Sequence, residues 1–141
     1  MSYTTPNDAE WDPLLQAAWQ AWGRAYAPYS RFQVGAALLC RDGSVHVGCN
    51  VENASYGGTI CAERTAICAA AAQGMRPNDI LALVVVTEAD SLTPPCGLCR
   101  QVIAEFAEDL PILLANRQER ALHDISSLLP HAFTGRNLLT S

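Results

Sequence analysis

The sequence predicts an α/β protein: a three-layer α/β/α sandwich around a mixed five-stranded sheet, in a single domain spanning residues 1–141. Segments with helix and strand patterns alternate in the order α-β-β-α-β-α-β-β. The segment 80–87, which is continuously apolar up to Val86, is typical of a central strand that is buried on both faces. Half of the residues are hydrophobic, which is enough for one core.

The first predicted helix begins at Asp12-Pro13, an N-cap residue followed by proline at the first helical position. Apolar side chains then recur at helical spacing over 14–22, and Pro28 closes the segment. Residues 1–10 precede this helix, and we expect them to be loosely ordered.

A β-hairpin follows the first helix. Residues 33–41 and 44–50 are rich in β-formers and flank Asp42-Gly43, a common turn pair. A two-residue turn at this point pairs Cys40 with Val45. It leaves Cys40 and Cys49 with no evident way to meet.

The second half of the chain supplies the other helices and the centre of the sheet. Residues 51–60 are rich in turn-forming residues and predict a loop. The alanine-rich segment 61–73 predicts a closely packed helix that ends at Gly74. The remaining predicted elements are a strand at 80–87, a helix at 96–107, strands at 111–115 and 120–123, and a short helix at 125–129.

Composition excludes several classes of function. The net charge is −5, and all nine basic residues are scattered arginines, so we expect no nucleic-acid partner. The longest apolar run, 80–86, is too short to span a membrane. The N-terminus lacks the features of a secretory signal, which favours a cytoplasmic protein. In such a chain, six cysteines indicate metal binding or catalysis more than disulfides.

Cysteines lie at the start of two predicted helices. Cys61 opens one helix, and Cys96 and Cys99 share a face in the first turn of the other. Two helix N-termini directed at one point provide positive partial charge and free amides, which favours thiolates. Thiolates bind zinc, so these three cysteines are candidate zinc ligands.

Three protein ligands leave one position of a tetrahedral zinc site open to water, as in catalytic sites. Glu63, in the first turn of the same helix as Cys61, is placed to curl back and to accept and return protons there. Arg64 lies three residues after Cys61, on the same side of the helix. It is placed to donate hydrogen bonds to thiolate sulfur and to offset the negative charge of the site.

Two other interpretations of these residues remain open. In a structural zinc module, a fourth protein ligand would close the site and Glu63 would only complement the helix dipole. The sequence shows no evident fourth ligand. In a dithiol redox protein, Cys96 and Cys99 would form the redox pair, which leaves Cys61 without a role. The other three cysteines, Cys40, Cys49 and Cys68, are assigned to packing.

Three spaced motifs, NVENASY at 50–56, CAERTAI at 61–67 and PCGLCRQV at 95–102, together resemble the small, homotetrameric, zinc-dependent type of cytidine deaminase. The segments YSRFQVGAAL at 29–38 and LLPHAF at 128–133 also fit. The resemblance covers about residues 14 to 133.

The resemblance implies that Cys61, Cys96 and Cys99 bind a zinc ion in each chain and that Glu63 is the catalytic proton shuttle. Arg64 matches an arginine of the family that lies behind the thiolates. The implied reaction is the hydrolytic deamination of free cytidine or 2′-deoxycytidine to uridine or 2′-deoxyuridine and ammonia, in pyrimidine salvage.

The resemblance also implies a nucleoside site. Phe32 would stack on the pyrimidine and the backbone of Ala62 would contact it, while Asn50 and Glu52 would bind the ribose hydroxyls. In the implied homotetramer, two more aromatic residues lie near subunit boundaries and complete a neighbouring active site; these are Tyr56 and Phe133.

Two positions depart from the family pattern and bear on the shape of the pocket. Thr59 stands where glycine is usual, and Leu98 stands where alanine is common. A cytosine-bearing nucleoside antibiotic such as blasticidin S is therefore an alternative substrate. The presence of both Asn50 and Glu52 favours an ordinary ribose.

Overall fold

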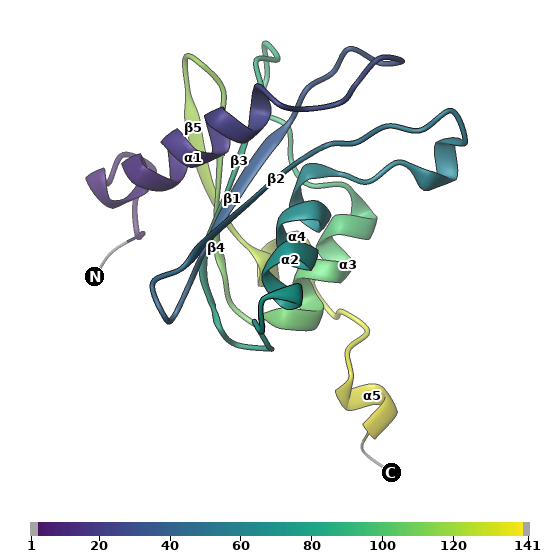
Figure 1. Ribbon diagram of the computed structural model, residues 1–141. Helices are drawn as coiled ribbons and strands as arrows, with labels where there is room; N and C mark the ends of the chain where they lie inside the picture. The colour runs from purple at the N-terminus through teal and green to yellow at the C-terminus, as the bar shows by residue number, and fades with distance from the viewer. Residues whose placement is uncertain (1–2, 140–141) are drawn as a thin grey trace.

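The computed structural model describes residues 3–139 and has the predicted three layers (Figure 1). A five-stranded sheet in the order β2-β1-β3-β4-β5 separates helix α1 on one face from helices α2, α3 and α4 on the other. The α/β class and the mixed sheet predicted from the sequence are confirmed. A short C-terminal helix, α5, extends away from the sheet.

The elements have the following bounds. The strands are β1 (Gly35–Cys40), β2 (Val45–Cys49), β3 (Ile80–Val86), β4 (Pro111–Ala115) and β5 (Arg120–Asp124). The helices are α1 (Asp12–Trp22), α2 (Ala62–Ala72), α3 (Gly97–Phe106), α4 (Ile125–Leu128) and α5 (Arg136–Leu139), with 3₁₀ turns η1 (Ala9–Trp11) and η2 (Tyr56–Gly58).

Strand β1 pairs antiparallel with both β2 and β3, and β4 pairs antiparallel with β5. Strands β3 and β4 are parallel, and α3 makes the crossover that such a pair requires. Helices α2 and α3 therefore lie on the same face of the sheet (Figure 1).

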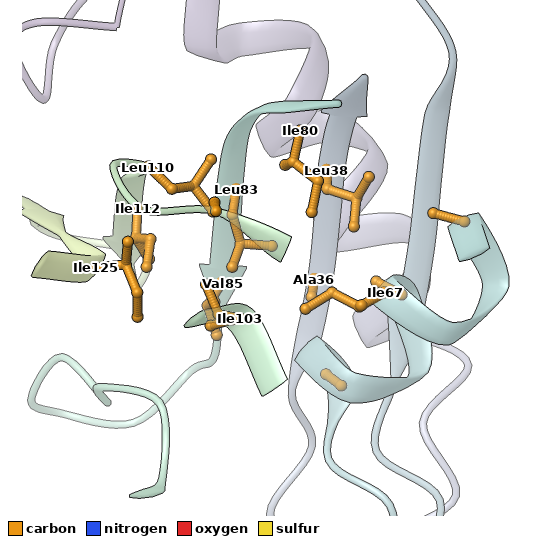
Figure 2. Close-up of a cluster of buried hydrophobic side chains, with 14 of the residues drawn as sticks. Ala36, Leu38, Ile67, Ile80, Leu83, Val85, Ile103, Leu110, Ile112 and Ile125 are labelled. Atoms are coloured by element: carbon orange, nitrogen blue, oxygen red, sulfur yellow. The ribbon is translucent and has the colours of Figure 1, made fainter. Parts of the chain in front are cut away.

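Two apolar cores fill the spaces between the layers. On the α1 side, Trp11 and Leu14 pack against strand residues that include Val84 and Leu113. On the other side, the largest cluster joins the sheet to α2, α3 and α4; the side chains labelled in Figure 2 include Leu38, Ile67, Leu83, Ile103, Ile112 and Ile125. Because successive residues of β3 point to opposite faces, both cores require apolar side chains, which explains its unbroken hydrophobic run.

The hairpin register differs from the prediction by one residue. Val45 pairs with Leu39, whereas the two-residue turn predicted Cys40 as its partner. The loop is longer because Gly43 adopts a positive φ of 86° and the Cys40 amide donates to the Ser44 carbonyl. The Asp42 carboxylate also accepts a hydrogen bond from the Ser44 amide at 2.9 Å. The side-chain bond favours the wider loop.

Helix α1 ends at Trp22, well before Pro28, the residue that we expected to close the segment. After the helix, the backbone at Tyr26 forms hydrogen bonds with the segment at 50–52. The Tyr26 amide donates to the Asn50 carbonyl at 3.0 Å, and the Glu52 amide donates to the Tyr26 carbonyl at 2.8 Å. Residues 24–34 therefore run beside the segment that follows β2.

The N-terminal residues make local contacts. The ring of Tyr3 packs edge-on against Trp11, with 4.8 Å between the ring centroids. The Asp8 carboxylate accepts hydrogen bonds from the amides of Thr4 and Thr5 at 3.0 and 3.1 Å. Of the segment 1–10, which we expected to be loosely ordered, residues 1–2 lie outside the described residues.

Candidate metal centre

The three predicted ligands meet where α2 and α3 begin. Cys61 is the N-cap residue of α2, and Cys96 is the N-cap residue of α3. Cys99 lies in the first turn of α3 and is fully buried. The three sulfur atoms lie within 4.8 Å of one another, and the Sγ atoms of Cys61 and Cys96 are 3.8 Å apart.

The donor set fits zinc. A zinc–sulfur bond of about 2.3 Å places two sulfurs of a tetrahedral site about 3.8 Å apart. The separation between the Cys61 and Cys96 sulfurs matches this value. Within residues 3–139, no His, Asp, Glu or further Cys joins the three sulfurs. The described residues therefore provide three ligands, which argues against the closed structural module.

Hydrogen bonds favour a thiolate at Cys61. The Cys99 thiol donates to Cys61, and together with Arg64 and Cys96 it lowers the pKa of Cys61 to about 5, against the opposing effect of burial. The same contact and burial raise the pKa of Cys99. Three adjacent thiols do not ionise together unaided, so a cation is needed to hold all three as thiolates.

Arg64 contacts the sulfur cluster from α2. Its Nη2 atom donates to the Cys61 sulfur at 3.6 Å and to the Thr59 carbonyl at 3.4 Å. The guanidinium group therefore adds positive charge behind the sulfur cluster and joins it to the loop before α2.

Glu63 is buried in the first turn of α2, with 5% of its surface exposed. Burial raises the pKa of its carboxyl to about 7; the nearby Cys61 thiolate adds to this effect and Arg64 opposes it. A carboxyl with this pKa accepts and releases protons readily near neutral pH.

Asn50 is buried beside the segment that carries Phe32. Its side-chain Oδ1 accepts a hydrogen bond from the Val34 amide at 2.9 Å, and its Nδ2 donates to the Phe32 carbonyl at 2.7 Å. Only 8% of Asn50 is exposed. The side chain that the resemblance assigns to the ribose therefore also holds the backbone on both sides of Gln33.

Glu52 holds the turn that precedes Phe32. Its Oε1 atom accepts from the amides of Tyr29 and Ser30 at 2.9 and 3.1 Å, and its Oε2 atom accepts from the Ser30 hydroxyl. The hydroxyl in turn accepts from the Phe32 amide at 3.0 Å. The Ser30 hydroxyl and then these amides lower the pKa of Glu52. Sequence reasoning missed Ser30, although a serine hydroxyl that accepts from the amide two residues further on is a known turn signal.

Three predicted aromatic residues are exposed: Phe32 at 40%, Tyr56 at 78% and Phe133 at 59%. The rings of Tyr29 and Tyr56 meet edge-on with their centroids 6.4 Å apart. Both tyrosines line a shallow pocket of about 390 Å³, together with Ser30, Glu52, Asn53 and Thr59. Phe133 is held at α3, where its carbonyl accepts a hydrogen bond from Gln101 Nε2 at 2.7 Å.

Arg100 is a second residue that sequence reasoning missed. Its Nε atom donates to the Pro95 carbonyl at 2.7 Å, and its Nη1 atom donates to the Leu128 carbonyl at 2.9 Å. It therefore fixes the approach to Cys96 against the end of α4. No local pattern signals this role, because the second partner is 28 residues away.

Comparison with known proteins decides the family. Residues 9–113 match the family model described as the cytidine and deoxycytidylate deaminase zinc-binding region. The chain belongs to this family. The zinc requirement predicted from the cysteines is thereby confirmed, and Cys61, Cys96 and Cys99 are the residues that fit the ion.

Relatives within the deaminase family align over nearly all of the chain. It is 51% identical to a cytidine deaminase of Halalkalibacterium halodurans, over 89% of this chain and 95% of the relative. The solved cytidine deaminase of Burkholderia pseudomallei is 49% identical with a TM-score of 0.84, covering 86% of this chain and 98% of that one. The solved enzyme of Mycobacterium tuberculosis is 45% identical with a TM-score of 0.75, covering 89% and 98%.

Three further expectations about single residues have structural outcomes. Cys68, which we assigned to packing, is exposed on α2, so that assignment is wrong. It lies seven residues beyond Cys61, on a part of the helix that the sheet does not cover. Thr59 accepts a hydrogen bond from the Asn53 amide at 3.2 Å, and Leu98 is exposed.

None of the helices in the described part of the chain is long and apolar enough to cross a membrane.

Proposed function

We propose that the protein is a zinc-dependent cytidine deaminase that converts free cytidine or 2′-deoxycytidine to uridine or 2′-deoxyuridine and ammonia, a step of pyrimidine salvage. The observation that carries the proposal is the meeting of three cysteine sulfurs and a buried carboxyl, Glu63, at two helix N-termini. A dithiol redox role would use only two of these four groups.

The chain's own groups account for the proton movements of the reaction. When bound by the three thiolates, zinc supplies a Lewis acid that activates water as a nucleophile near neutral pH. Glu63 takes a proton from the attacking water and delivers it to N3 of the pyrimidine. It then takes the proton of the hydroxyl now attached to C4 and passes it to the amino nitrogen; the C4–N bond breaks, ammonia leaves and the C4 carbonyl forms. Water and cytidine are thus converted to uridine and ammonia with all atoms accounted for.

The nucleoside is bound by the residues around this centre. Phe32 stacks on the pyrimidine, and the backbone of Ala62, the residue between Cys61 and Glu63, contacts the base. Asn50 and Glu52 bind the ribose hydroxyls. Their internal hydrogen bonds leave capacity for this, because the Asn50 amide nitrogen has a second hydrogen and the Glu52 Oε2 atom, which accepts one bond, has a second lone pair.

We also propose that the enzyme is a homotetramer with shared active sites. Tyr56 and Phe133 are large, exposed aromatic side chains, which are costly to leave in water and are enriched at interfaces. Each would complete the site of a neighbouring chain. The free state of all six cysteines fits a reducing cytoplasm. The acidic net charge argues against a nucleic-acid substrate.

The test is ammonia release from a panel of cytidine, 2′-deoxycytidine, cytosine, cytidine monophosphate and a cytosine-containing single-stranded oligonucleotide. We expect turnover of the two nucleosides, loss of turnover after chelation and recovery with zinc. Turnover of the oligonucleotide alone would contradict the proposal.

The role of Glu63 has its own test. We expect Glu63→Gln to keep its zinc and to lose turnover by at least about 100-fold, because the amide cannot shuttle protons. Glu105→Gln, an exposed change on α3, is the matched control and should keep wild-type kcat. If Glu63→Gln keeps its turnover, Glu63 is not the proton shuttle.

A further inference from the structure

Gly48, in the edge strand β2, lies against the start of α2. A Cβ atom added at Gly48 would come within 2.4 Å of the Ala66 amide nitrogen and 2.5 Å of the Ala62 carbonyl oxygen. It would also lie 2.9 Å from the Cβ of Thr65. Two of these three neighbours are backbone atoms, which cannot rotate away. A side chain at position 48 therefore requires the helix or the strand to move.

The backbone that Gly48 contacts is the turn that carries the site. Ala62 and Ala66 flank Glu63, and both are fully buried. The amide and the hydroxyl of Thr65 both donate to the Cys61 carbonyl at 3.0 Å, which ties Cys61 to the same turn. A shift of this turn therefore moves the Cys61 sulfur and the Glu63 carboxyl together.

The other two sulfurs would not follow such a shift. Cys96 and Cys99 belong to α3, and the approach to Cys96 is held separately by Arg100 through the Pro95 carbonyl. The distances among the three sulfurs thus depend on how deeply α2 sits on the sheet.

We propose that Gly48 is a positioning residue for the metal centre: because it has no side chain, α2 sits close enough to β2 for Cys61 and Glu63 to meet Cys96 and Cys99. This inference rests on the proposed zinc function and adds a residue that the resemblance did not assign. Relieving a 2.4 Å contact to an ordinary 3.4 Å requires a movement of about 1 Å (3.4 minus 2.4). Metal–ligand distances tolerate only about 0.2 Å, and a 1 Å misplacement can cost about 100-fold in rate.

The chain offers a matched control on the opposite face of the sheet. A Cβ at Gly35 would come within 2.1 Å of the Ala18 carbonyl oxygen and 2.6 Å of the Trp22 amide nitrogen, in the last turn of α1. In the β1–β2 register Gly35 pairs with Cys49, so the two glycines lie close together in the sheet. Gly35→Ala creates an equally severe clash but pushes on a helix that carries no ligand.

The experiment compares Gly48→Ala with Gly35→Ala. Zinc affinity is measured by competition with a chromophoric chelator, ligand geometry by the absorption spectrum of the cobalt-loaded protein, and thermal unfolding with and without zinc. We expect Gly48→Ala to weaken zinc binding at least tenfold, to alter the cobalt spectrum and to reduce the zinc-induced rise in Tm. Gly35→Ala should lower the Tm of the metal-free protein and keep wild-type zinc affinity and spectrum.

A milder variant tests the same role of Gly48 if Gly48→Ala does not fold. Ala66→Ser adds one oxygen atom to a fully buried residue whose backbone amide faces Gly48, and it should weaken zinc in the same direction by a smaller factor. Wild-type zinc affinity and cobalt spectrum in the folded variants at positions 48 and 66, or equal losses in Gly35→Ala, would overturn the positioning role while leaving the proposed function intact. If the wild-type protein itself binds no zinc, the proposed function fails and this inference fails with it.

Discussion

The two faces of the sheet are built alike, but only the face that α2 and α3 cover has the candidate metal centre. Each face buries an apolar core, and on each a glycine lets a helix backbone approach closely: Gly35 beneath α1 and Gly48 beneath α2. These glycines lie at the same end of the sheet, yet α1 presents its last turn there and α2 its first.

The direction of the helices explains the difference. A helix N-terminus has positive partial charge and free amides, and a C-terminus has negative partial charge. On the other face, the N-termini of α2 and α3 meet at Cys61 and Cys96, whose sulfur atoms are 3.8 Å apart, and such helix ends favour anions. The end of α1 would disfavour the same anions. Burial is therefore not what locates the site; the orientation of the helices at one edge of the sheet is.

The largest effect should come from removing one of the three cysteine ligands on the face of the sheet that α2 and α3 cover. We expect Cys99→Ser to lower zinc affinity by more than about 100-fold, because the loss of a ligand exceeds the usual effect of mutating a supporting residue. Turnover should fall with the zinc content. Zinc per chain and ammonia release are the measurements. Cys68→Ser, at an exposed position on α2, should behave as wild type; equal zinc loss in both variants would contradict the assignment.

The next effect concerns the α1 face, where we expect a loss of stability without a loss of function. Leu113 is fully buried against α1, so Leu113→Ala should lower the free energy of unfolding by about 2 to 5 kcal/mol. Zinc affinity and kcat per folded molecule should stay at wild-type values. Leu138→Ala, an exposed change in α5, should change stability by less than about 0.5 kcal/mol. Denaturant unfolding with parallel zinc titration separates the two outcomes.

A smaller effect is expected at Glu52, in the loop between β2 and α2, where the stability of the turn at Ser30 should depend on pH. Hydrogen bonds lower the pKa of Glu52 from 4.5, so the folded loop gains stability from the ionised carboxylate above pH 4.5. This contribution is lost as pH falls through the lowered folded pKa. We expect hydrogen exchange of the Tyr29 and Ser30 amides to accelerate in that acid range in the wild-type protein. In Glu52→Gln these amides should exchange quickly at neutral pH as well.

Ser30→Ala provides the control for this prediction. It removes the hydroxyl bond to Glu52 and keeps the two amide bonds, so it should shift the acid transition to higher pH without abolishing it. If amide exchange in the wild-type protein shows no acid transition, Glu52 does not hold the turn through its charge.

The smallest expected effect is at the exposed edge of the α1 face. Arg117 pairs with Glu88 at 2.9 Å and stacks over Trp19 at 3.6 Å from the ring centroid. Both partners of the ion pair are about half exposed, so solvent screens their attraction. Arg117→Gln should therefore lower stability by about 1 kcal/mol or less. A larger loss in denaturant unfolding, or any change in zinc affinity, would show that this edge is coupled to the rest of the fold.

Local patterns in the sequence were sufficient for the order of the elements and for choosing the three cysteines that the structure brings together. The apolar run at 80–86, the helix-start context of Cys61 and Cys96, and the spacing to Cys99 each depend on neighbouring residues. The hairpin register and the end of α1 were predicted less well. In the hairpin, the Ser44 amide donates to the Asp42 carboxylate, a local turn bond that sequence reasoning overlooked. At the end of α1, the bond from the Tyr26 amide to the distant Asn50 carbonyl outweighed local preference.

The composition of the centre follows from the sequence alone: three cysteines, one acidic residue and one arginine at the starts of two helices. How these groups meet, and which residues support them, follows from the tertiary structure, because both depend on contacts between segments far apart in the chain. Three contacts are of this kind. Arg100 donates a hydrogen bond to the loop before Cys96, Glu52 accepts hydrogen bonds from the turn at Ser30, and Gly48 allows the backbone of α2 to approach β2 closely. Local spacing does not encode them, since each requires two elements to be already packed on the same sheet.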